Sequence, residues 1–96
     1  MKPSESFELN REAIRQAAQK YNLHNPRVFG SVADGTDTED SDIDILVFSP
    51  LGNSILELAG FLAALEDKIP FKIDIHTEKS LPIAFRQEVL DSAKPV

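Results

Sequence analysis

The stretch from Arg27 to Val47 decides the fold of this chain. It reads Arg27-Val-Phe-Gly-Ser-Val-Ala-Asp-Gly35, then an acidic loop, then Ser41-Asp-Ile-Asp-Ile-Leu-Val47. The pattern predicts a short apolar strand over 27–29, a sharp turn at Gly30-Ser31 and a second strand over 43–48. Because alternate side chains of a strand point to the same face, Asp42 and Asp44 share one face of the second strand. The opposite, apolar face fixes that strand against a core and comprises Ile43, Ile45 and Val47.

A rigid pair of carboxylates is typical of a site for a hard divalent cation. Two adjacent carboxylates repel each other unless a cation lies between them. Mg2+ and Mn2+ prefer oxygen ligands, and Mg2+ is usually held by one or two carboxylates together with substrate phosphates. A calcium-binding EF-hand loop is excluded, although Asp40, Asp42 and Asp44 have its one-three-five spacing. Its sixth and twelfth positions would be Ile45 and Leu51, where that loop needs Gly and Glu.

Composition bounds the class of protein. The 96 residues are 42% hydrophobic, enough for one core, so we expect a single domain over 1–96. The net charge of −6 argues against a surface that coats nucleic acid, which needs clustered Lys and Arg. Cysteine is absent, and we see neither a membrane-spanning run nor a secretory pattern. We therefore expect a soluble cytoplasmic protein that contacts neither membrane nor nucleic acid.

Acidic residues are concentrated in one short segment. No Lys or Arg occurs between Arg27 and Lys68, whereas Asp and Glu crowd the segment 34–44. We interpret Asp37, Glu39 and Asp40 as solvated loop residues, the usual fate of an acidic cluster. Asp42 and Asp44 differ from them because they lie within an apolar strand pattern.

Helices and strands alternate along the rest of the chain. Apolar spacing predicts a helix over 6–21, capped by Ser4 or Ser6, and another over 54–68, capped by Asn53. A strand over 71–76 follows Pro70, and a last helix begins at Ser80, with Leu81 and Pro82 in its first turn. We expect the buried side of that last helix to comprise Ile83, Phe85, Val89 and Leu90. The order α-β-(α)-β-α-β-α predicts an α/β (α+β) fold, a small mixed sheet with helices packed on it.

Asp74 is the third candidate site residue. It lies in the middle of the predicted strand 71–76, on the face opposite Phe71, Ile73 and Ile75. Three convergent carboxylates can hold two metal ions that clamp the attacking and leaving oxygens of an in-line phosphoryl displacement. Gly30 permits close approach of the backbone to a phosphate, and Ser31 offers a hydroxyl and an N–H group at the start of a helix.

Two neighbours of Asp74 have open roles. His76 shares its face and is within reach of a substrate, but a lone histidine on a strand face is more often structural or exposed. Lys72 is a candidate phosphate contact.

These residues resemble the DNA polymerase beta-like nucleotidyltransferase superfamily. Its pattern Gly-Ser-x-Ala-Arg-Gly, followed by Ser-Asp-x-Asp, is met at Gly30, Ser31, Ala33, Gly35, Ser41, Asp42 and Asp44. The element order is similar along nearly the whole chain, and the size resembles that of the minimal nucleotidyltransferases, the MNT proteins. The resemblance implies that Asp42, Asp44 and Asp74 bind Mg2+, with two ions expected and Mn2+ as an alternative. It further implies that Asp74 helps to deprotonate the acceptor and that Gly30, Ser31 and Ser41 contact the nucleotide, ATP.

The resemblance also implies a partner. MNT proteins look like the antitoxin half of toxin–antitoxin modules whose toxin is a helical HEPN ribonuclease, and they transfer AMP from ATP to a toxin tyrosine. A homo- or hetero-oligomer is compatible with this reading, because the small chain has no second domain to grip an acceptor. A small acidic protein also suits a basic, RNA-binding partner.

One position departs from the family pattern. Asp34 stands where the family has Arg, and a carboxylate near a triphosphate weakens binding by repulsion. The negative charge of the phosphates must then be neutralised by Mg2+, by backbone N–H groups, or by Arg27, Lys72, Lys79 or Arg86. The alternative is therefore an antitoxin with a weak or inactive site that neutralises its partner by binding alone. Transfer of a nucleotide to a small molecule such as an aminoglycoside is a third reading, disfavoured by the short chain.

Overall fold

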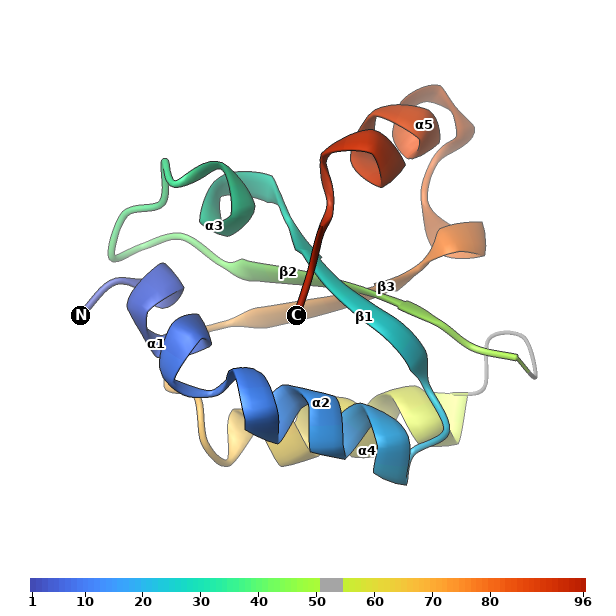
Figure 1. The fold of residues 1–96 in the computed structure, drawn as a ribbon, viewed down its shortest axis with the longest axis horizontal. Coiled ribbons are helices and arrows are strands. Elements are labelled where there is room, and N and C mark those ends of the chain that lie inside the picture. Colours follow the sequence, from blue (N-terminus) through green and yellow to red (C-terminus); the bar gives the residue numbers. More distant parts are fainter. Residues whose placement is uncertain (51–54) are drawn as a thin grey trace.

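A computed structural model describes residues 1–50 and 55–96 as a four-stranded mixed sheet with helices on both sides (Figure 1). This is the predicted fold class. In chain order the elements are α1 (Pro3–Leu9), α2 (Arg11–Lys20), β1 (His24–Phe29), α3 (Gly30–Asp34), β2 (Ile43–Phe48), α4 (Ile55–Glu66), β3 (Ile73–Thr77), the 3-10 turn η1 (Glu78–Ser80), α5 (Ile83–Ser92) and β4 (Lys94–Pro95).

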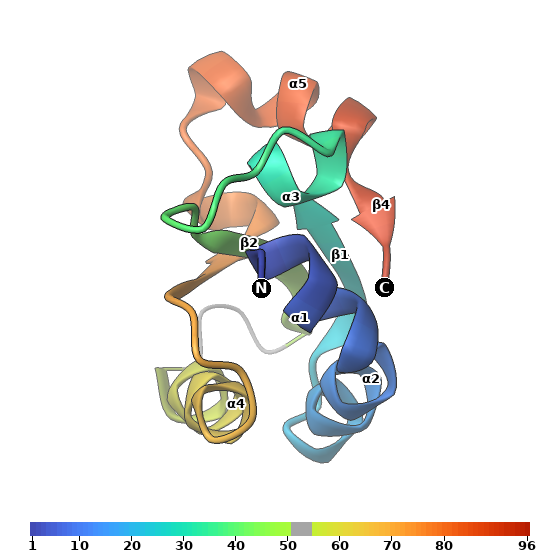
Figure 2. The ribbon, with the colours of Figure 1, turned by 90° about the vertical axis from the view of Figure 1, so that its left-hand side faces the viewer.

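The strands lie in the order β3-β2-β1-β4, with β2 in the interior of the sheet. β2 pairs antiparallel with β1 and parallel with β3, and β4 pairs antiparallel with β1. Helices α2 and α4 lie side by side against one face of the sheet and α5 lies on its other side, while α3 follows the end of β1 and contributes Val32 and Ala33 to the core cluster (Figures 1 and 2). The sheet thus separates a helical core layer from the face on which the site forms.

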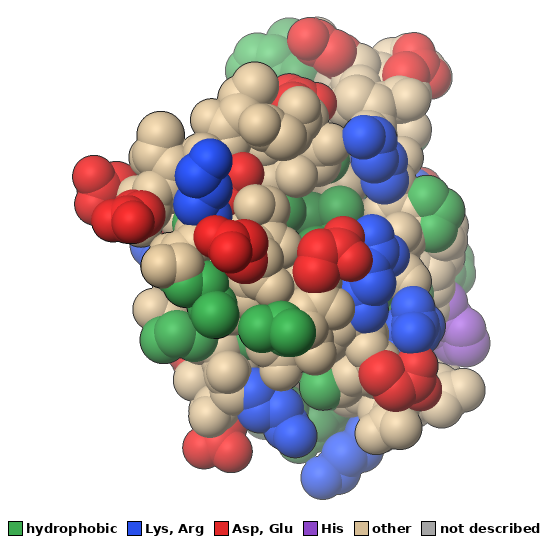
Figure 3. All heavy atoms as spheres, turned by 60° about the vertical axis from the view of Figure 1, so that its left-hand side comes forward, with side chains coloured by type: hydrophobic (Ala, Val, Ile, Leu, Met, Phe, Trp, Pro, Cys, Tyr) green, Lys and Arg blue, Asp and Glu red, His purple; other side chains and the backbone are tan. Residues whose placement is uncertain are grey.

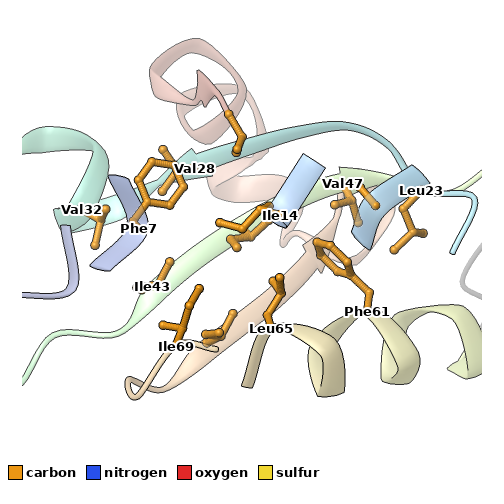
Figure 4. Close-up of a cluster of buried hydrophobic side chains, with 14 of the residues drawn as sticks. Phe7, Ile14, Leu23, Val28, Val32, Ile43, Val47, Phe61, Leu65 and Ile69 are labelled. Carbon is orange, nitrogen blue, oxygen red and sulfur yellow. The ribbon is translucent and has the colours of Figure 1, made fainter. Parts of the chain in front are cut away.

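The hydrophobic core lies between the sheet and α1, α2 and α4 (Figure 4). Ile43, Ile45 and Val47 of β2 are completely buried in it, as the alternation along that strand predicts. They pack with a cluster that includes Phe7, Ile14, Leu23, Val28, Phe61, Leu65 and Ile69. Burial of this face fixes the position of β2, and with it the direction of the side chains on the opposite face.

The predicted helix over 6–21 is wrong, because the structure has two helices that meet at Asn10. The N–H of Asn10 donates to Phe7 O, and its side-chain amide donates to Ser6 O at 2.8 Å. Asn side chains bond readily to nearby backbone and therefore favour helix ends over helix interiors. The first helix begins at Pro3, next to Lys2, so neither Ser4 nor Ser6 is its N-cap residue.

Asp37 corrects a second expectation. It is buried, with 5% of its surface exposed, whereas Glu39 and Asp40 are exposed as predicted. Its Oδ2 accepts a 2.8 Å hydrogen bond from the N–H of Ser4 in the first turn of α1. Burial raises the pKa of Asp37, but hydrogen bonds from Ser4 and from its own backbone, together with the charge of Lys2, outweigh burial, so the pKa lies below its ordinary value. Asp37 therefore ties the loop that precedes Asp42 to the first helix.

The C-terminal helix also differs from the prediction. It begins at Ile83, after Pro82, and Ser80 instead ends the turn η1, where its hydroxyl accepts from the N–H of Thr77. No residue of α5 is buried, and Ile83 and Phe85 are 84% and 53% exposed. The predicted buried side of this helix is therefore wrong: Ile83 and Phe85 are exposed, and Val89 and Leu90 are only half-buried. Apolar spacing alone does not reveal that, among the described residues, no element buries the apolar side chains of α5.

The other boundaries moved by a few residues. The first strand begins at His24 instead of Arg27, the second helix spans Ile55–Glu66, and the third strand spans Ile73–Thr77. The proposed cap Asn53 lies outside the described residues. The strand Ile43–Phe48 is confirmed at both ends.

Two surface properties bear on the expected partners. Among the described residues, no helix combines the length and apolar character needed to cross a membrane. On the face seen in Figure 3, acidic, basic and hydrophobic side chains are interspersed. That face offers no continuous basic surface of the kind that neutralises nucleic-acid phosphates.

Candidate active site

The site is built on one row of residues that crosses three strands. Phe29 of β1 pairs with Asp44 of β2, which pairs in turn with Asp74 of β3. Residues at the same register position in neighbouring strands point to the same face, so the carboxylates of Asp44 and Asp74 lie on one face of the sheet, opposite the core. Sequence reasoning predicted that these side chains share a face. The pairing of β2 with β3 is what brings them side by side.

Asp42 lies at the end of the loop that leads into β2, two residues before Asp44. Its Oδ2 is 3.7 Å from Nζ of Lys72, the residue before β3. Both side chains are solvent-accessible, so this ion pair is weak and free to rearrange. Ser41 shapes the same loop, because its hydroxyl accepts a 2.9 Å hydrogen bond from the N–H of Thr38. Lys72 is thus placed beside the predicted carboxylates, and Ser41 has a structural partner.

Gly30 brings the start of α3 against Asp44. Its φ of +74° is one that residues with a Cβ rarely adopt, and a Cβ there would lie 2.6 Å from Oδ2 of Asp44. The absence of a side chain at Gly30 therefore leaves room for the Asp44 carboxylate. Ser31 follows in the first turn of α3, and Gly35, also at positive φ, ends that helix after one turn.

His76 lies two residues along β3 from Asp74, on the same face of the strand. Its Nε2 is 3.8 Å from Oδ1 of Asp44, and its ring meets that of Phe29 edge-on, with centroids 5.2 Å apart. An edge-on aromatic pair restricts the orientation of both rings. The imidazole is therefore held beside the carboxylate row. The sequence alone left open whether His76 lies near the site or is structural or exposed.

Arg27, Leu46 and His76 lie at the same register position on three neighbouring strands. Leu46 pairs with Arg27 on one side and with His76 on the other, and it is completely buried. Above it, Arg27 bonds to Glu78 of η1 with 2.6 Å between Nη2 and Oε1, and the Arg27 side chain is only 11% exposed. Arg27, one of the cations named as candidates to meet phosphate charge, is thus engaged in a bridge that fixes η1 over the sheet.

Two further cations near the site donate to backbone carbonyl groups. Arg86 donates to the carbonyl oxygens of Lys79 and Leu81. Lys94, which sequence reasoning missed, donates from Nζ to Ala33 O at 2.8 Å and so bonds a carbonyl near the end of α3. Nothing in the sequence around Lys94 indicates this contact, because Lys94 and Ala33 are far apart along the chain.

A pocket of about 320 Å³ adjoins the carboxylate row between α3 and α5. Phe29, Gly30 and Asp34 line its one side, and α5 lines the other with Phe85, Glu88, Val89 and Ser92. Asp34, which replaces the Arg of the family pattern, therefore faces a space directly beside Gly30. With Glu88 it makes the polar part of this pocket acidic.

The described residues bring Asp44 and Asp74 to one face but do not arrange three or more His, Asp or Glu side chains as a metal cage. The Asp42 side chain turns toward Lys72 and that of Asp44 toward His76. The donor set is nevertheless the one a hard divalent cation prefers, and the two partners are weakly held. The metal-binding role of these residues stays a prediction.

The comparison with known proteins agrees with this geometry. Residues 11–96 match the model of a family described as "Nucleotidyltransferase domain". The chain belongs to this nucleotidyltransferase family. Two proteins of Methanocaldococcus jannaschii, MJ0126 and MJ1379, provisionally named protein adenylyltransferases, are 35% and 36% identical to this nucleotidyltransferase. Each alignment covers 81% of this chain and 80% of the relative.

Solved structures show the same fold. A structure provisionally described as a minimal nucleotidyltransferase is 36% identical and superposes with a TM-score of 0.86, over 98% of this chain and 96% of the other. A toxin–antitoxin structure with AMP-PNP is 23% identical and has a TM-score of 0.75, over 90% of this chain and 71% of that chain. The first likeness confirms the predicted minimal nucleotidyltransferase fold, and the second adds a more distant example of that fold.

Proposed function

We propose that this nucleotidyltransferase transfers AMP from ATP to a hydroxyl group of a partner protein. The observation that carries the proposal is the row of Asp44 and Asp74 in register, with Asp42 at the entrance of β2 and Gly30 against Asp44. The row is rigid because the apolar face of β2 behind it is completely buried. Relatives named as protein adenylyltransferases support a protein acceptor.

In the proposed reaction, the acceptor oxygen attacks the α-phosphorus of ATP in line with the leaving group. A new phosphorus–oxygen bond forms to the acceptor, the bond to the β-phosphate oxygen breaks, and pyrophosphate leaves. Asp74 accepts the hydroxyl proton, while the N–H groups at the start of α3, including that of Ser31, bind phosphate oxygens. The close approach of α3 to Asp44 at Gly30 positions these donors beside the carboxylates.

Asp42 and Asp44, with Asp74, are the residues that would hold Mg2+ or Mn2+. A bound divalent cation supplies charge neutralisation at the phosphates and orients the two oxygens of the displacement. Their carboxylate chemistry fits a hard cation, and the nearest competing cation, Lys72, is exposed and loosely paired with Asp42.

The partner that we propose is a HEPN-type toxin, modified on a tyrosine, so that this chain acts as its antitoxin. The proposal rests on the motif resemblance and on charge, since a chain of net charge −6 suits a basic RNA-binding partner. The described part of the chain offers a site open to one side, beside a pocket lined by Phe29 and Phe85, on which an acceptor surface can close.

The test combines the purified protein with the protein encoded beside it, ATP and Mg2+, followed by intact mass of both chains. The expected result is a gain of one or more AMP units on the partner, lost in Asp44→Asn. Asp40→Asn is the matched control, because Asp40 is an exposed carboxylate of the same acidic segment without a place in the row.

The outcomes separate the alternatives. No mass gain with a tight complex still formed would replace the enzymatic proposal by an antitoxin that acts through binding alone, with Asp34 as the first residue to examine. Equal mass gain in wild type and Asp44→Asn would remove the assignment of the carboxylate row.

A further inference from the structure

Helix α5 presents one of its faces to an open space. Phe85, Glu88, Val89 and Ser92 recur at three- and four-residue spacing, so they share a face of the helix. This face lines the pocket of about 320 Å³, and Gly30 lies across the pocket from it. No residue of α5 is buried, and Figure 1 shows the helix apart from the sheet. A helix of ten residues is marginal on its own in water and gains most of its stability from packing, so this face suits a partner that fills the pocket.

The polar part of this pocket is acidic and unpaired. Asp34 lines it on the α3 side and Glu88 on the α5 side, and both residues are exposed. Among the described residues, neither carboxylate has an ion pair or a side-chain hydrogen bond. Within the same part of the chain, no Lys or Arg lines the pocket, and Lys94 donates to the carbonyl oxygen of Ala33. The pocket therefore repels an anion and favours a cation.

Two aromatic rings distinguish between the possible cations. Phe29 of β1 and Phe85 of α5 line the same pocket as the two carboxylates. An arginine guanidinium stacks on aromatic rings and bonds carboxylates through a planar set of N–H groups, whereas a lysine ammonium is a compact, strongly hydrated charge. A divalent metal ion would need oxygen ligands where the rings lie. The volume is at the small end of the range for ligand sites, which suits one long side chain.

The pocket adjoins the place that we propose for the triphosphate. Gly30 lines the pocket and lies against Asp44, and its neighbour Ser31 is a proposed phosphate contact. Asp34 stands where the family pattern has an arginine, so the chain lacks that positive charge. A cation in the pocket lies between the phosphates and the two carboxylates, where it replaces the missing charge.

We propose that this pocket binds an arginine side chain of the partner protein, which completes the triphosphate site in trans. This inference rests on the proposed function, because it names the feature of the protein acceptor that the site recognises. The guanidinium bonds Asp34 and Glu88, lies against Phe29 and Phe85, and offers its remaining N–H groups to the phosphates. In other phosphoryl-transfer enzymes an arginine from a second protein stabilises the phosphate charge in the same way. Partner and nucleotide then tighten each other's binding by the same factor.

Argininamide tests the pocket without a partner protein and without a reaction. Citrullinamide is the matched control ligand, because it has nearly the same shape but no charge. We expect argininamide to shift the amide NMR signals of Gly30 and Val89, which lie on opposite sides of the pocket, and citrullinamide to leave them unchanged. The double variant Asp34→Asn/Glu88→Gln should not respond to either ligand. Equal shifts with both ligands, or no shift with argininamide, would overturn the proposal.

An ATP analogue tests whether the arginine and the triphosphate act together. A methylene group between the α- and β-phosphorus prevents transfer of AMP, so only binding is measured. This analogue should tighten argininamide binding severalfold in the wild type at low ionic strength, and less at high salt. An argininamide affinity that is the same with and without the analogue at low salt would contradict the role of the arginine at the triphosphate.

Calorimetry with the protein encoded beside this one separates this proposal from the proposed function. The double variant Asp34→Asn/Glu88→Gln should weaken the complex by about tenfold, the combined effect of two exposed ion pairs and a cation–π contact. Asp44→Asn should lose transfer but keep its affinity for the partner, and Asp40→Asn is the control for loss of an exposed carboxylate. Wild-type affinity in the double variant would contradict the arginine pocket even where AMP is transferred. Weaker binding in the double variant, with no transfer by the wild type, would contradict the reaction alone.

Discussion

Gly30 combines an unusual backbone conformation with close contact to a candidate site residue, Asp44. Its φ is positive, and a Cβ atom there would lie 2.6 Å from Oδ2 of Asp44, which leaves no room for a side chain. We expect Gly30→Ala to lower the free energy of unfolding by about 1–2 kcal/mol and to displace Asp44. Urea denaturation and the transfer rate measure the two effects. Gly35→Ala is the control: Gly35 also has a positive φ, but no atom lies within 4 Å of its Cβ position. It should lose comparable stability yet retain transfer.

Asp37 gives the fold a pH dependence. Its pKa lies below its ordinary value of 3.8, so its carboxylate stabilises the folded state above that value, and this stabilisation is lost as the pH falls through the lower folded-state pKa. We expect Asp37→Asn to lower the free energy of unfolding by about 1 kcal/mol near neutral pH, which is the usual effect of losing a helix cap. The difference from wild type should shrink in acid. Denaturation at several pH values measures it, and a difference that persists at low pH would argue against the charged hydrogen bond to Ser4.

Asp34 sets the electrostatics of the pocket beside Gly30. Replacement by Arg restores the family pattern and changes a repulsive charge to an attractive one toward a triphosphate. We expect Asp34→Arg to tighten ATP binding by about tenfold at low ionic strength, and less at high salt, because exposed charges are screened. Calorimetric titration with ATP measures this. Binding that is equal to wild type at all salt concentrations would place the triphosphate away from Asp34.

At the scale of elements, α2 and α4 fit together through Tyr21 and Gly60. A Cβ at Gly60 would overlap the Tyr21 ring, at Cε1. We therefore expect Gly60→Ala to destabilise the protein, although alanine favours a helix over glycine by about 1 kcal/mol. In a Tyr21→Ala background the same substitution should become stabilising. A double-mutant cycle by urea denaturation measures the change of sign, and additive effects would refute the contact.

The elements that sequence predicted best are those with the strongest periodicity. Alternation in Ile43–Phe48 gave both ends of β2, because that strand is buried on its core face. The first helix was extended through Asn10 because its apolar spacing continues across the break, while the bond from Asn10 to Ser6 O is a local interaction that spacing does not report. The start of the last helix failed for a similar reason, since Ser80 suits a cap but bonds to Thr77 instead.

At the scale of the whole molecule, the family and the shared face of Asp44 and Asp74 could be predicted from residues alone, whereas the convergence of Asp42 with them stays a prediction. Strand alternation states which side chains share a face, and the motif around Gly30 carries the family resemblance. The contacts between distant segments could not be predicted in this way. The bridge from Arg27 to Glu78, the bond from Lys94 to Ala33 and the burial of Asp37 all depend on the topology of the sheet.

The central claim is that the carboxylate row forms a divalent-cation site that acts together with a nucleotide. Electron paramagnetic resonance of Mn2+, titrated into the protein with a non-hydrolysable ATP analogue, tests this without a partner protein. We predict saturable binding in the wild type and in Asp40→Asn, and an affinity at least about 100-fold weaker in Asp44→Asn, which lacks a direct ligand. Equal Mn2+ affinity in all three proteins would contradict the assignment of this row as the active site.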